Sequence, residues 1–232
     1  MARLTQGTEL ADAITAAIRG GDVDALAGRL AADPQLAAAR IVGADGARSL
    51  LHVLTDWPGR VPNGAAIARR LVEAGADVDA PFEGCHAETA LHWAASCDDV
   101  EVLDALLDLG ADVEAPGGVI GGGAPLADAV AFGQWGAARR LVARGARVTL
   151  WQAAALGLTA ETQAYLAGDP TRDDRDDALW FAGHGGQHET AALLLAAGAD
   201  PRRAGHDGLT PAQAARRSGA LEVAAWLDGA AT

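Results

Sequence analysis

The sequence predicts an all-α solenoid in which about seven short helix–turn–helix units stack in a row. A Gly-Ala motif recurs at Gly75, Gly110, Gly145 and Gly198, and the first three copies lie 35 residues apart. Apolar residues ahead of each copy follow the period of a helix. The composition agrees, because half of the 232 residues are apolar but only 4% are aromatic, which suits helices packed closely through small side chains.

Residues 100–109 show the design of one unit most clearly. Their apolar side chains fall on one stripe of a helix, formed by Val102, Leu103, Leu106 and Leu107. Gly110 suits the left-handed position that ends a helix, and Thr89 suits the N-cap of the helix before it. Helices of about ten residues are unstable alone, so neighbouring units must cover the stripe.

We divide the chain into consecutive units within a single domain, 1–232: residues 9–45, 46–80, 81–116, 117–148, 149–170, 171–203 and 204–232. The first is a degenerate N-terminal cap whose helices begin near Asp12, and the last is the C-terminal cap. The second carries extra residues, "WPGRVPNG", between its helices. The fifth starts at Thr149, too soon after Gly145 for a full connecting hairpin. We expect the charge run 169–178, "DPTRDDRDDA", to form the solvated hairpin before the sixth unit.

Two stretches, "ETALHWAASCDDVEVLDALLDLGADVEAP" and "HDGLTPAQAARRSGALEVAAWL", closely resemble the ankyrin-repeat family. The resemblance implies a curved array whose inner helices and hairpin fingers form a concave groove, and it implies binding of other proteins there. It gives His52 and His92 the family's structural histidine position. The second, fourth and sixth units depart from the Thr-Pro-Leu-His pattern at Ser49-Leu50, Ala127 and Trp180.

Charge and composition limit the classes of molecule that the protein is expected to bind. The net charge is −13 and the chain contains no lysine, so binding to nucleic acid or to an anionic membrane is disfavoured, whereas a protein with a basic surface is favoured. No signal-peptide pattern or membrane-length apolar run is present, which predicts a cytoplasmic protein. The arginine-only, alanine-rich composition is typical of a GC-rich bacterial genome.

No metal, cofactor or catalytic motif is expected. Cys85, His86, His92 and Cys97 lack the paired spacing of zinc ligands. The glycine-rich segment 116–125 lacks the lysine of a phosphate-binding loop, and we expect it to form a flexible hairpin finger. We find no sequence pattern of a known hydrolase, and predict that the chain is not an enzyme.

The residues expected to face the groove lie in slots that vary between repeats. Trp57 and Phe132 are the strongest candidates, because exposed aromatic side chains make binding hot spots. Trp93 and Phe181 are equally consistent with packing between inner helices. The full expected binding set is Arg19, Asp56, Trp57, Trp93, Asp128, Phe132, Phe181 and His184.

The leading hypothesis is therefore a monomeric, non-catalytic scaffold that binds a partner protein in the groove. The first alternative is an atypical enzyme or small-molecule binder, with a pocket between the aromatic side chains and Asp56, Asp128 or His184 as acid–base groups. The second alternative is a structural subunit whose groove closes around another copy of the chain.

Overall fold

Seven helix pairs follow one another in the computed structural model, which describes residues 2–205 and 207–231. The predicted all-α repeat architecture is confirmed. The chain divides into two compact bodies, an N-terminal body that ends at Ala146 and a C-terminal body that starts at Arg147. None of the described helices is long and apolar enough to cross a membrane.

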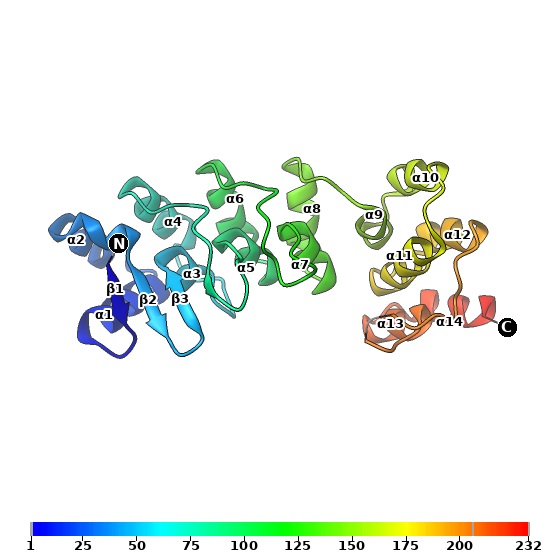
Figure 1. The fold of residues 1–232 in the computed structure, drawn as a ribbon, viewed down its shortest axis with the longest axis horizontal. Helices are drawn as coiled ribbons and strands as arrows, with labels where there is room; N and C mark the ends of the chain where they lie inside the picture. The colour runs from blue at the N-terminus through cyan, green and yellow to red at the C-terminus, as the bar shows by residue number, and fades with distance from the viewer. Residues whose placement is uncertain (1, 206, 232) are drawn as a thin grey trace. The chain divides into compact units, whose positions relative to one another are not determined.

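The N-terminal body contains four helix pairs, seen in blue to green in Figure 1. The first helices of the pairs are α1 (Glu9–Arg19), α3 (Leu50–Thr55), α5 (Ala90–Ser96) and α7 (Pro125–Ala131). The second helices are α2 (Val23–Ala32), α4 (Gly64–Glu73), α6 (Val100–Asp108) and α8 (Trp135–Ala143). Each helix contacts its counterpart in the next pair, so the first helices form one row and the second helices form another.

The C-terminal body contains three pairs, seen in yellow-green to red in Figure 1. They are α9 (Leu150–Leu156) with α10 (Thr159–Ala167), α11 (Arg172–His184) with α12 (His188–Ala196), and α13 (Pro211–Arg217) with α14 (Leu221–Ala230). Its core is formed by leucine and alanine side chains of these helices, such as Leu179, Leu194 and Leu227.

Three of the four side chains of the stripe predicted in residues 100–109 lie in the core, whereas Leu107 is only partly buried. Val102, Leu103 and Leu106 of α6 are at most 1% exposed, and α6 packs between α4 and α8. Gly110 follows this helix with φ of 94°, in the left-handed region that glycine adopts without strain.

A four-stranded sheet, which the sequence analysis did not predict, supplements the helices of the N-terminal body. Its order is β1 (Arg3–Thr5), β2 (Arg40–Gly43), β3 (Gly46–Ser49) and β4 (Glu83–Gly84), and only the β1–β2 pairing is parallel. A short 3-10 helix, η1 (Pro34–Ala38), leads into β2. Arg3 and Arg40 both pair with Glu83, at 2.7 and 2.8 Å, and so link β1 and β2 to β4.

His52 and His92 have the architectural role that the resemblance implies. The Nε2 of His52 lies 2.9 Å from the carbonyl oxygen of Glu88, and the Nε2 of His92 lies 3.1 Å from that of Gly123. A carbonyl can only accept, so each Nε2 carries the hydrogen. Burial lowers the pKa of His52 to about 4 and also lowers the pKa of His92, and both rings are neutral at pH 7.

The charge run 169–178 does not form a hairpin, which corrects the prediction. Thr171 caps α11 through a hydrogen bond from the backbone N–H of Asp174 to its hydroxyl, so most of the run is the first part of this helix. Asp176 is 3% exposed, and its Oδ1 accepts the N–H of Asp200 at 2.6 Å. The run is helical because it contains a threonine cap followed by acidic residues in the first turn.

Candidate functional site

The N-terminal body has a hollow of about 250 Å³ with three aromatic side chains in its wall: Trp57, Trp93 and Phe132. We call it the aromatic hollow. Trp57 and Phe132 are 81% and 49% exposed, which is unusual for side chains of this size. The rest of the lining consists of Thr55, Asp56, Glu88, Ser96, Cys97 and Val119.

Three consecutive first-row helices position these aromatic side chains. Trp57 follows the end of α3, Trp93 lies within α5, and Phe132 is the C-cap of α7. The extra residues of the second unit, which begin with Trp57, therefore form part of the site. Gly59, in this segment, has φ of 71° and approaches Cys97 so closely that a Cβ would lie 2.8 Å from the Cβ of Cys97.

The segment after Trp57 is also tied to α6 of the next pair. The backbone N–H of Arg60 donates to Oδ2 of Asp99 at 2.7 Å, while Oδ1 of Asp99 caps α6 by accepting the N–H of Val102 at 3.2 Å. One buried carboxylate thus joins the insertion to a rigid helix. This contact holds the exposed Trp57 near the wall formed by α5.

Trp93 is fixed by polar and aromatic contacts together. Its indole N–H donates to Oε2 of Glu88 at 2.9 Å. Its ring makes an edge contact with His52, with centroids 4.8 Å apart, and lies 5.6 Å from Phe82. Trp93 is partly buried, so it both packs between repeats and lines the hollow.

Glu88 and Asp128 form a buried acidic pair beneath the hollow. They are 5% and 0% exposed. Burial, followed by hydrogen bonding with Glu88, raises the pKa of Asp128 to about 7. Oδ2 of Asp128 is buried and has no hydrogen-bond partner within hydrogen-bond distance among the described residues.

Asp128 also organises the glycine-rich segment of the fourth repeat. Its Oδ1 accepts the backbone N–H of Ile120 at 3.1 Å. The segment closes on itself through Gly117 N–H to Gly122 O and Gly118 N–H to Gly123 O, each at 3.0 Å. It forms a hydrogen-bonded finger that carries Val119 into the wall of the hollow. Asp128 was expected to face the groove, but it is completely buried and reaches the hollow only through Glu88.

Arg19 and Asp56 meet at the rim as an ion pair. Oδ2 of Asp56 lies 2.6 Å from Arg19 and 3.5 Å from Arg48. The guanidinium of Arg48 also lies 5.8 Å from the centroid of the Trp93 ring, within the range of a cation–π contact. Six of the eight expected binding residues thus belong to one constellation within the N-terminal body.

The other two expected residues belong to the C-terminal body. Phe181 packs against Trp151 and Trp180, with centroids 4.4 and 4.9 Å apart. Nδ1 of His184 lies 3.0 Å from the hydroxyl of Ser218, and this residue is 9% exposed. These contacts place Phe181 and His184 in an aromatic cluster of their own body.

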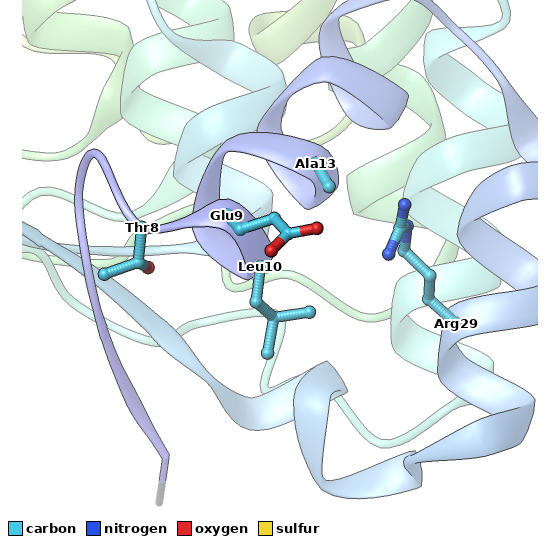
Figure 2. A pocket seen from close by; sticks show the side chains of 5 residues that line it. All are labelled: Thr8, Glu9, Leu10, Ala13 and Arg29. Carbon is cyan, nitrogen blue, oxygen red and sulfur yellow. The ribbon is translucent and has the colours of Figure 1, made fainter.

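A larger hollow of about 420 Å³ lies beside α1 and α2 (Figure 2). Its lining is Thr8, Glu9, Leu10, Ala13 and Arg29. Figure 2 shows Glu9 and Leu10 extending from α1 on one side and Arg29 from α2 on the other. This lining contains no aromatic side chain and no buried ionisable pair, so it has less capacity for specific recognition than the aromatic hollow.

The family model for ankyrin repeats, in three copies, matches residues 16–151, which is more than half of the chain. The chain belongs to the ankyrin-repeat family. Repeats of this family generally mediate interactions between proteins and are typically non-catalytic. The crystal structure of the human ASB11 ankyrin repeat domain is also similar, with a TM-score of 0.56 and 20% identity over 92% of this chain and 96% of that chain. No curated protein matches the sequence.

Among the described residues of this ankyrin-repeat chain, no three histidine, cysteine or acidic side chains lie close enough together to hold a metal ion. Burial, with the nearby carboxylates of Asp99 and Asp56, raises the pKa of Cys97 to about 11. The side chain is therefore a neutral thiol at pH 7, a poor metal ligand and a poor nucleophile.

Sequence reasoning did not identify Glu88, which contributes the buried carboxylate of the hollow. Glu88 directly precedes Thr89, the N-cap of α5, and lies five residues before Trp93. A carboxylate just before an ankyrin helix, five residues before a tryptophan in that helix, could have indicated a hydrogen bond between the two side chains. Its pairing with Asp128, in the next repeat, could not be read from either repeat alone.

Proposed function

We propose that this ankyrin-repeat protein is a non-catalytic binding module that recognises a partner protein at the aromatic hollow of its N-terminal body. The observation that carries the proposal is the convergence of Trp57, Trp93 and Phe132 from three successive repeats on one exposed hollow. Tryptophan is among the residues that dominate binding energy at protein interfaces, and hot spots cluster in well-packed pockets.

The size of the hollow supports a protein partner over a free small molecule. Its volume of about 250 Å³ is below the roughly 300–1,000 Å³ of typical small-molecule sites. A single side chain of a larger partner fits such a space, while the surrounding surface supplies the remaining contact area. We also expect a monomeric protein that acts in the cytoplasm.

An atypical enzyme or small-molecule binder is the second candidate. It is favoured by the pKa of Asp128, about 7, because strongly shifted pKa values gather at catalytic sites. Against it, Asp128 already bonds the backbone of Ile120 and does not line the hollow. Burial of Asp128 between two repeats therefore explains its raised pKa without a catalytic role.

Selection from a display library of random peptides tests the proposal. The native protein serves as bait, and the Trp57→Ala/Phe132→Ala variant serves in counter-selection. We expect peptides that bind the native protein at least about tenfold more tightly than the variant, which corresponds to the loss of ordinary hot-spot side chains. The matched control is Leu221→Ala, which truncates a side chain that is 64% exposed on α14 of the other body.

Peptides that bind the native protein, the control and the double variant equally would refute the proposal. A metabolite that co-purifies with the native protein and is lost from the double variant would instead favour the small-molecule alternative.

A further inference from the structure

The aromatic hollow combines exposed ring faces with a carboxylate underneath. Trp57, Trp93 and Phe132 form the rings, and Glu88 lines the same space. We propose that the hollow receives one arginine side chain from a basic segment of the partner protein. This inference rests on the proposed function and specifies the chemistry of the residue that the partner inserts.

The aromatic wall already accepts a guanidinium group in this structure. Arg48 holds its guanidinium 5.8 Å from the centroid of Trp93 and 3.5 Å from Oδ2 of Asp56. A planar guanidinium stacks on aromatic faces and is more weakly hydrated than an ammonium group. The side chain of Arg48 is 30% exposed and does not line the hollow, so it shows that the wall suits arginine without filling the space.

Charge favours a cation in the hollow over a neutral apolar group. The carboxylate of Glu88 lines the hollow and is 5% exposed, and a carboxylate shielded from water attracts a cation more strongly than an exposed one. Its Oε2 also lies 2.8 Å from Nδ1 of His86. At the rim, the charge of Asp56 is offset by Arg19 and Arg48. The carboxylates of Asp98 and Asp99 are both engaged by Arg60 of the insertion, through its guanidinium at 3.7 Å and its backbone N–H at 2.7 Å, respectively.

The net charge of the whole chain also favours a positively charged partner. With a net charge of −13 and arginine as its only side-chain cation besides histidine, the protein attracts basic partners and repels acidic ones at long range. The hollow then provides the local contact: ring faces along the side chain, and a carboxylate near its charged end.

Hydrogen bonding adds a third feature that an arginine would use. Ser96 lines the hollow, and its hydroxyl oxygen is buried without a hydrogen-bond partner among the described residues. The five N–H groups of a guanidinium can supply that partner, whereas leucine or phenylalanine cannot.

Titration of the intact protein with three small amides tests the inference. The probes are the N-acetyl methylamides of arginine, of citrulline, which is its neutral near-isostere, and of leucine. The readout is the indole N–H resonances of Trp57 and Trp93 in NMR spectra, assigned with single variants. We expect arginine amide to bind roughly 2- to 30-fold more tightly than citrulline amide, as the measured range of cation–π contacts implies.

Two charge variants with matched controls make the test specific. Glu88→Gln keeps an acceptor for Trp93 and removes the buried charge; it should weaken the binding of arginine amide and leave leucine amide unchanged. Arg48→Met removes the resident cation and should strengthen the binding of arginine amide. The controls are Glu101→Gln on α6 and Arg69→Met on α4, which make the same charge changes at exposed positions.

The inference is overturned if leucine amide binds as tightly as arginine amide, because the hollow is then an ordinary apolar pocket. It is equally overturned if none of the amides shifts the two indole resonances. Both results differ from a failure of the proposed function, which appears as the absence of any selected peptide that depends on Trp57 and Phe132.

Discussion

Replacement of Asp128 by asparagine should make the protein more stable, and by a larger amount at pH 8 than at pH 5. Asparagine mimics the protonated acid, since its amide can donate toward Glu88 while its oxygen accepts from the N–H of Ile120. The variant therefore keeps the hydrogen bonds of the pair at every pH, whereas the native protein keeps them only while the pair holds its proton.

The direction follows from the raised pKa of Asp128, from 3.8 to about 7. A carboxyl group that binds its proton more tightly in the folded state stabilises that state below its unfolded pKa. This stabilisation is lost as the pH rises through the folded pKa. The free energy of unfolding of the native protein should thus decrease between about pH 4 and pH 7.

The size of the effect follows from the same shift. Each pKa unit corresponds to about 1.4 kcal/mol, so the full shift sets a ceiling of about 4 kcal/mol. Local relaxation and water entry reduce this, and we expect Asp128→Asn to gain at least about 1 kcal/mol relative to the native protein at pH 8.

Urea unfolding at pH 5 and pH 8 measures this difference. Repeat arrays can lose two-state behaviour, so the indole resonance of Trp93 should be followed alongside circular dichroism to report on the N-terminal body. A stability difference between native and variant that is the same at both pH values would refute the raised pKa of Asp128. A variant that is less stable at pH 8 would refute it as well.

Three further predictions concern packing, the exposed rings and the thiols. Leu106→Ala should reduce the free energy of unfolding by about 2–5 kcal/mol in denaturant titrations, because this side chain is 0% exposed in α6; a loss below about 1 kcal/mol would contradict the assigned core. Trp57→Ala/Phe132→Ala should change that free energy by less than about 1 kcal/mol, as expected for exposed side chains, and early thermal unfolding of the variant would show that the rings are core. At pH 8, Cys97 should react with iodoacetamide about a hundredfold more slowly than an ordinary thiol, because its pKa is raised from 9.0 to about 11. Peptide mass spectrometry compares it with the exposed Cys85, and equal rates at the two sites would contradict this result.

The repeat architecture could be predicted because its signals are local. Each helix pair needs an apolar stripe, a cap and a glycine at the end, and these recur at fixed spacing, as in residues 89–110. The same helix-capping hydrogen bond is also present in a repeat that matches the family pattern less closely. Gln152 accepts the backbone N–H of Thr149 at 2.8 Å, as His92 does for Thr89 at 3.0 Å.

The features that sequence reasoning missed depend on partners distant in the chain. Strands β1 and β4 have three and two residues, too few for an alternating pattern, and they are joined through the pairing of Arg3 and Arg40 with Glu83. The charge run at the start of α11 was predicted to be solvated because nothing local shows that Asp176 is buried against the N–H of Asp200.

The candidate site was predictable only in part for the same reason. Variable slots of the repeat indicated Trp57 and Phe132, which the structure exposes at one hollow. The acidic pair could not be found this way, since Glu88 and Asp128 are 40 residues apart and their coupling arises from the stacking of adjacent repeats. Asp128 was predicted to face the groove, but it is completely buried.

The most direct test of the central claim is chemical-shift mapping of the native protein with a peptide selected by display. The account predicts that the largest shifts occur at the indole resonances of Trp57 and Trp93 and in the backbone around Phe132, and that they disappear with the Trp57→Ala/Phe132→Ala variant. Tight binding of a peptide whose shifts leave these three residues unchanged would contradict the claim that the aromatic hollow is the site of partner recognition.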